Sequence, residues 1–359
     1  MLCSLLAVCL LLSVRAHAAQ LPQELAERFG LSALATDVPP ELEDWDLTVG
    51  KVIALTPQEL AALARSTLHR KAEACRSAIL SLLGLSLLAG TARQIGGESL
   101  FAETASVLSA LLVVLTVRSP MLAVLSGAAA TIRHAAQFLI VFVPVYAGVT
   151  AAGGAAAAAS SYQVLLLAFA QVLSGGISAV LLPLCLVLFE LCIAETLACG
   201  LLPRWSLWVK RAVCLSLALA ATVFCGFLSL QTALTGAADH TAAKTAKFLA
   251  ESFVPVIGKA VADGVAAAQG GVRILRASVG SFGIAAAAAL FLPAVLETGL
   301  LRLGLFAAEY SAELFEAVSA AQVLRAFGQM LEVVLALLLS LALLLIASAA
   351  ILLSAGVGA

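Results

Sequence analysis

Charged residues within apolar sequence are the residues that could do chemistry in this chain. Lys247 and Glu251 lie four positions apart, as do Lys259 and Asp263, so each pair can meet on one helix face. Pro255 separates the two pairs and prevents one continuous regular helix. At membrane depth, broken helices occur where they are buried in protein or line a cavity. Residues 241–281 therefore form either a pair of amphipathic surface helices or a re-entrant hairpin that lines a cavity.

Other polar residues occur near the ends of apolar runs. Glu190 and Glu195 lie five positions apart, on different helix faces, and three roles stay open for them: an interfacial position, a polar contact between helices, or a role with protons or ions. Gln231 is predicted to bond a neighbouring helix. Arg133, with His134 beside it, and Glu297 are interpreted as residues at a membrane boundary.

No pattern in the sequence indicates catalysis. The nucleotide-binding GxxxxGK[ST] motif, the zinc-binding HExxH motif and the nucleophile motif GxSxG do not occur. Cys185, Cys192 and Cys199 are spaced by seven, so neighbours on this helix face lie about 10 Å apart. Metal ligands must converge to about 2.3 Å from one ion. We therefore expect no cofactor, no metal site and no enzyme activity, and interpret the cysteines as a packing seam.

The elements that position these residues must be membrane helices. Charged residues make up 11% of the 359 residues and hydrophobic residues 62%, against about 25% charged residues in a soluble domain. The mean hydropathy is +1.09. A soluble fold must keep a polar exterior, so this composition predicts an all-α, polytopic helical integral membrane protein. The net charge of −1 gives no basic field for nucleic acid.

The N-terminal part differs in composition from the rest. Residues 1–18 combine an apolar core from Leu5 to Leu12 with Ala16-His17-Ala18, which predicts a cleaved signal peptide; an uncleaved short anchor is the alternative. Residues 19–76 form a short extracytoplasmic segment, acidic and then amphipathic. Thr56 is placed to cap a helix that begins at Pro57.

Residues 77–359 are predicted to be a polytopic membrane domain with six to eight spans. A span needs about 20 apolar residues. Ser174-Gly175-Gly176 divides the longest apolar block. The basic loop with Arg204, Lys210 and Arg211 predicts a cytoplasmic position and a C-terminus outside, although Arg118 and Arg133 then fall on the opposite side. The apolar runs lie at 77–90, 100–117, 137–153, 158–173, 177–199, 212–234, 282–307 and 330–356.

The sequence resembles the stage III sporulation protein AE family. The match is sharpest at Ser252-Phe253-Val254-Pro255-Val256-Ile257-Gly258-Lys259 with Asp263, preceded by Thr245-Ala246-Lys247-Phe248. Leu228-Ser229-Leu230-Gln231-Thr232 and the central Val143-Pro144-Val145 are similar to the family as well. One departure lies at Leu275-Arg276-Ala277, where members carry Leu-Lys-Asn: the cation is kept and the amide is lost.

The resemblance implies a membrane-embedded component of the channel between mother cell and forespore, a secretion-like complex required for sporulation. It implies a multi-pass position in the mother-cell membrane around the forespore. The implied partners are the other stage III sporulation A proteins and, across the intermembrane space, the forespore protein Q complex. Candidate pore or packing residues are Gln231, Lys247, Glu251, Pro255, Gly258, Lys259, Asp263 and Arg276. A self-sufficient secondary transporter or permease is the alternative function.

Overall fold

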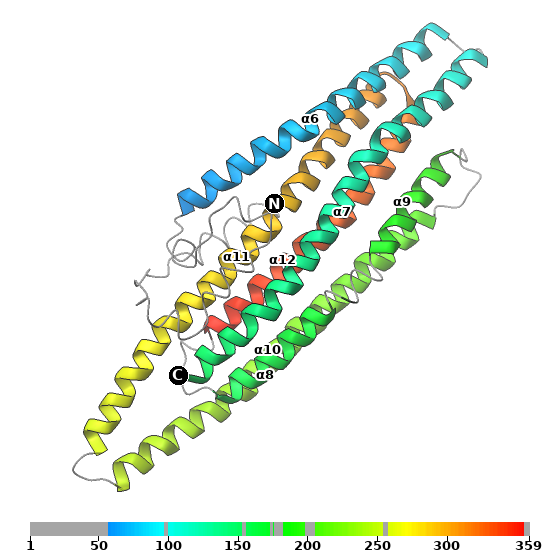
Figure 1. Cartoon of the computed structure of the whole chain (residues 1–359). Coiled ribbons are helices and arrows are strands. Elements are labelled where there is room, and N and C mark those ends of the chain that lie inside the picture. The colour runs from blue at the N-terminus through cyan, green and yellow to red at the C-terminus, as the bar shows by residue number, and fades with distance from the viewer. Residues whose placement is uncertain are drawn as a thin grey trace.

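A computed structural model shows an elongated bundle of helices (Figure 1). It describes residues 57–96, 100–152, 156–172, 175, 182–197, 205–253 and 258–354. For some of these residues, including the described ones between 232 and 278, it describes only the backbone. The predicted signal peptide and residues 19–56 lie outside the described residues. The helices are α6 (Pro57–Gly96), α7 (Leu100–Ala152), α8 (Ala156–Gln171), α9 (Leu182–Leu197), α10 (Trp205–Phe253), α11 (Gly258–Leu314) and α12 (Val318–Ser354).

The described residues contain four helical segments that are long and apolar enough to cross a membrane: Val107–Ala152, Trp205–Gln231, Phe282–Leu314 and Val318–Ala349. The described residues therefore contain fewer candidate spans than the six to eight predicted from the sequence. The runs at 100–117 and 137–153 are not separate spans, because both lie in α7. The intervening sequence is rich in alanine, the best helix former. The apolar block at 158–199 contains two helices as predicted, since α8 ends at Gln171 and α9 begins at Leu182; the position of the break at residues 174–176 stays a prediction.

Charge-free segments of five helices define an apolar zone in the bundle. These segments have 16 to 20 residues, so they rise about 24–30 Å, close to the roughly 30 Å of a bilayer's hydrocarbon core. Helix α11 runs opposite to α7, α10 and α12 (Figure 1), which brings the segments side by side. The apolar zone comprises residues 135–152 of α7, 156–171 of α8, 212–231 of α10, 277–296 of α11 and 333–349 of α12.

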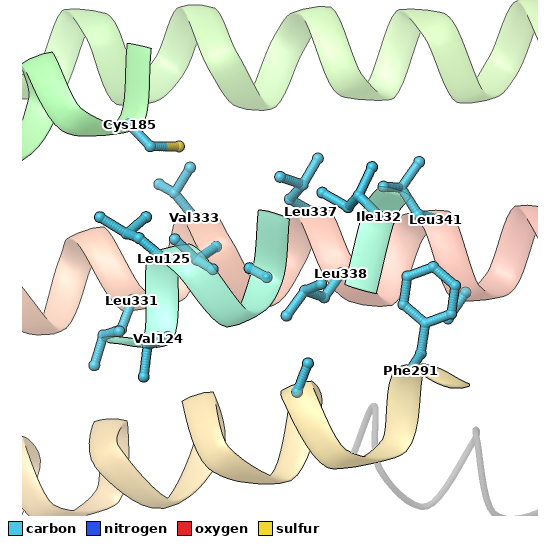
Figure 2. Close-up of a cluster of buried hydrophobic side chains, with 14 of the residues drawn as sticks. Val124, Leu125, Ile132, Cys185, Phe291, Leu331, Val333, Leu337, Leu338 and Leu341 are labelled. Carbon is cyan, nitrogen blue, oxygen red and sulfur yellow. The ribbon is translucent and has the colours of Figure 1, made fainter. Parts of the chain in front are cut away.

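The core of the bundle lies where α7, α11 and α12 pack together. Figure 2 shows Ile132 of α7 near Leu337 and Leu341 of α12. These three side chains are at most 2% exposed. Helices α8, α9 and α10 pack on one side of this core and α6 on the other. Interhelical packing of apolar side chains therefore holds the bundle together, as lipid gives no hydrophobic drive for association.

Glu316 terminates α11 in a left-handed conformation, with a φ of 58°. The amide of Ala317 donates to the carbonyl of Ala312 at 2.8 Å, and the amide of Glu316 donates to the carbonyl of Glu313 at 3.0 Å. This pair of hydrogen bonds is the Schellman arrangement, in which glycine usually occupies the left-handed position. It reverses the chain within three residues, so that α12 packs antiparallel to α11.

We expect Glu316→Gly to raise the stability of the protein by about 1 kcal/mol, because a residue with a Cβ pays about that much for the left-handed conformation. Thermal unfolding of the purified protein in detergent measures the change. Glu316→Ala is the control, since it removes the carboxylate but keeps the Cβ. An equal gain in both variants would show that the charge, not the backbone conformation, is responsible.

Candidate functional site

The candidate residues predicted from the sequence lie along one helical hairpin, made of the C-terminal part of α10 and the N-terminal part of α11. Lys247 and Glu251 belong to α10, and Lys259, Asp263 and Arg276 belong to α11. The predicted break is confirmed, because α10 ends at Phe253 and α11 begins at Gly258. Pro255 lies outside the described residues, and so do the side chains of the charged residues. Gln231 is half-buried on α10.

The two arms of this hairpin do not form a separate pair of surface helices. They continue the membrane helices without interruption: α10 runs from Trp205 to Phe253 and α11 from Gly258 to Leu314. In Figure 1 both arms extend past the ends of α7, α8 and α12. Alanines in the first arm favour continuation of the helix, and no proline occurs in α10. Whether the hairpin enters the bilayer stays a prediction.

An ionic node joins three helices at the opposite end of the apolar zone. Glu332 of α12 accepts hydrogen bonds from Arg302 Nη2 of α11 at 2.8 Å and from Lys210 Nζ of α10 at 3.1 Å. The Arg302 guanidinium lies over Gly328, where an added Cβ would stand 2.9 Å from Nη1. Gly328, one helical turn before Glu332, therefore leaves space for the guanidinium of Arg302. Because one carboxylate serves two cations, the node carries a net charge of +1.

Two further polar contacts lie toward the same end of the bundle. Arg325 of α12 pairs with Glu309 at 2.8 Å and also with Glu313, both on α11. Glu195 of α9 accepts from the amide of Ser206 at 2.7 Å and from its hydroxyl at 2.5 Å. Ser206 is the second residue of α10, so the carboxylate satisfies an amide that the helix itself leaves unpaired. Of the three roles open for Glu195, the polar contact between helices is the one observed.

Cations from three helices gather at this end of the apolar zone, which we call the charged end. Arg118 and Arg133 precede the apolar segment of α7, and Lys210 and Arg211 precede that of α10. Arg302 follows the apolar segment of α11, which runs in the opposite direction. Arg118 and Arg133 therefore lie on one helix and precede its apolar segment, as Lys210 and Arg211 do on the parallel helix α10; the predicted separation of the two groups by a membrane is not supported by this arrangement, and the side on which each lies stays a prediction. The predicted separation arose because residues 100–117 and 137–153 were counted as two spans, whereas they form one helix.

The family model for stage III sporulation protein AE matches residues 58–356 of the chain. The chain belongs to the stage III sporulation protein AE family. No curated protein and no solved structure matches it. The resemblance noted at residues 245–263 is confirmed, and the match extends over every described helix apart from the first residue of α6.

In this member of the stage III sporulation protein AE family, small residues hold α6 against α11. Ser86 Oγ lies 2.6 Å from Ser311 Oγ. An added Cβ at Gly90 would stand 2.2 Å from Phe315 Cβ, and one at Gly304 would stand 2.4 Å from Ile79 Cγ1. All three contacts join residues 225 positions apart, so the two helices run parallel in a constant register. Small residues allow this close approach, as is common between membrane helices.

Sequence reasoning missed the ionic node and the α6–α11 seam of this family member. Arg302 and Glu332 are thirty residues apart and Lys210 is 122 residues from Glu332, so no local pattern links them. One signal was present in the sequence: Glu332 directly precedes a charge-free segment, and Lys210 and Arg302 lie within a few residues of one. Among the described residues, no three His, Cys, Asp or Glu side chains lie close enough to hold a metal ion.

Proposed function

We propose that this chain is a membrane-embedded component of the channel complex that joins mother cell and forespore. Family membership makes it a stage III sporulation protein. The observation that supports a role in the channel complex is the α10–α11 hairpin. Its first arm, residues 232–253, rises about 33 Å beyond the apolar zone. A helical projection of that length outside lipid offers a surface for other proteins of the complex.

The direction of the hairpin supports this role. At the charged end, α7, α10 and α11 carry Arg118, Arg133, Lys210, Arg211 and Arg302, and the positive-inside rule favours a cytoplasmic position for such an end. The hairpin carries cations as well: Lys244, Lys247, Lys259, Arg273 and Arg276. The hairpin lies at the other end of the apolar zone. In a mother-cell membrane around the forespore, it projects into the intermembrane space. We propose that it meets the other stage III sporulation A proteins there and the forespore protein Q complex across that space.

Site-specific photocrosslinking in sporulating cells tests the proposal. A photoreactive residue is placed in turn at positions 247–250, which sample every face of one helical turn of α10. We expect at least one of these positions to crosslink to a stage III sporulation A protein or to the forespore protein Q. Leu219 is the control, because its side chain is 58% exposed within the apolar zone of the same helix. Crosslinks to these proteins from position 219 alone would contradict the proposal.

A self-sufficient transporter is the alternative that a second experiment separates. The purified chain is reconstituted alone in liposomes, and solute uptake is measured with and without Lys259→Ala or Asp263→Ala. We expect no uptake by the chain alone. Uptake that either substitution abolishes would favour the transporter and overturn the channel proposal.

A further inference from the structure

A groove of about 540 Å³ lies at the charged end, between α10 and α12. Two adjacent cations line it, Lys210 and Arg211, and no carboxylate occurs among the described residues of its lining. The remaining lining residues are Leu207, Trp208, Cys214 and Gln329. An apolar floor with two cations and an amide suits a ligand that has an anionic group attached to an apolar body.

The cations of the groove keep charge available for such a ligand. Lys210 bonds Glu332, but an ammonium has three donors, and the node of Lys210, Arg302 and Glu332 already carries one net positive charge. Arg211 is exposed, and the described residues show no carboxylate paired with it. Lys210, Arg302, Glu332 and Arg211 together therefore carry a net charge of +2 in and beside the groove. An anion placed there meets attraction from two directions.

The position of the groove matches a membrane interface. Trp205 and Trp208 begin α10 and are 59% and 72% exposed. Exposed tryptophans beside Lys and Arg at the start of an apolar helix are typical of the headgroup level of a bilayer. The apolar segment of α10 begins immediately after Arg211. The groove thus lies at the depth of lipid headgroups.

An uncovered apolar face continues from the groove along α10. Only 11% of the α10 span is buried inside the bundle, compared with 39–56% of the other three candidate spans. The exposed side chains recur at intervals of three or four residues, which places them on one helix face. They are Leu215, Leu219, Val223, Phe227 and Leu230.

We propose that this groove binds an anionic phospholipid, with its phosphate at Lys210 and Arg211 and its acyl chains along the exposed face of α10. Charge complementarity favours this occupant. The headgroup of a zwitterionic lipid would place its own cation near Lys210 and Arg211, and a second copy of α10 would place two further cations there. The proposal depends on the membrane position of α10 and not on the channel function.

Native mass spectrometry of the purified full chain in detergent tests the proposal, with phosphatidylglycerol and phosphatidylcholine as competing probes. We expect phosphatidylglycerol to be retained preferentially. Arg211→Gln is expected to lower this preference about fivefold, the effect of removing one cation near a membrane surface. Arg118→Gln is the matched control, because Arg118 is an exposed arginine of α7 at the same end of the bundle. That variant is expected to keep the preference.

Four outcomes would overturn the proposal. Equal retention of the two lipids would show that the groove does not recognise an anion. An equal loss in both variants would show that surface charge in general attracts the lipid. Displacement of bound lipid by millimolar inorganic phosphate, or an oxidised dimer linked through the exposed Cys214, would identify a free anion or a second copy as the occupant instead.

Discussion

Alanine at Gly90 is expected to leave the protein about 1–3 kcal/mol less stable than alanine at Gly84. The added Cβ at position 90 would stand 2.2 Å from Phe315 Cβ and 3.0 Å from the Phe315 carbonyl oxygen. The carbonyl belongs to the tight turn between α11 and α12, so it cannot give way without moving that turn. Overpacking at such a contact costs about 1–3 kcal/mol.

Gly84 provides the matched control for this prediction. Both glycines lie in α6, and apart from the backbone of α6 itself and the two chain neighbours, nothing stands within 4 Å of a Cβ added at position 84. Both substitutions gain the same helix propensity, about 1 kcal/mol, so the difference between the variants isolates the packing against Phe315. Thermal or denaturant unfolding in detergent measures it. Equal stability of the two variants would mean that α6 does not pack against the α11–α12 turn in this register.

Glutamine at Glu332 is expected to cost about 2 kcal/mol of stability. The substitution keeps the size of the side chain but removes the negative charge that pairs with both Lys210 and Arg302. Loss of one partner from a buried ion pair costs about 3–5 kcal/mol, because a charge is left uncompensated. The Glu332 side chain is 45% exposed, so solvent screens part of this penalty. Unfolding of the purified protein in detergent measures the loss.

Glu316→Gln is the control for the substitution at the node. Glu316 is exposed in the turn after α11, and no ion pair of the described residues includes it. We expect its replacement to change stability by less than about 0.5 kcal/mol. The loss at Glu332 should also shrink in 1 M salt, where the Debye length is about 3 Å. A loss that is unchanged by salt would attribute the effect to packing rather than to charge.

Local features were predicted correctly from the sequence. The helix start at Pro57, the break between residues 158 and 199 and the break at Pro255 all coincide with helix boundaries. Proline and glycine act on the backbone within a few residues, so their effect is visible without knowledge of the fold. The same reasoning placed separate helices at 100–117 and 137–153, whereas α7 continues through both and contains Pro120 and Pro144. Packing of neighbouring helices offsets the hydrogen bonds that these prolines lose.

The candidate site divides in the same way. The candidate charges at residues 247–263 were found because their spacing of four is a local pattern, and Arg276 was found through the family resemblance. The node of Lys210, Arg302 and Glu332 was not found, since its partners come from three helices. Nor does any pattern along the chain show that Gly328 is needed beneath Arg302.

The sequence by itself determined the helical class, the membrane character and the family, because composition, backbone preferences and motif similarity are carried by the residues alone. Only the tertiary structure decided which helices continue through the polar segments and which cations gather at one end. The direction in which α11 packs against α12 brings Arg302 to Glu332, and the constant register between α6 and α11 brings Gly90 to Phe315. These contacts depend on the relative direction and offset of helices distant in sequence, which the order of residues along one helix does not specify.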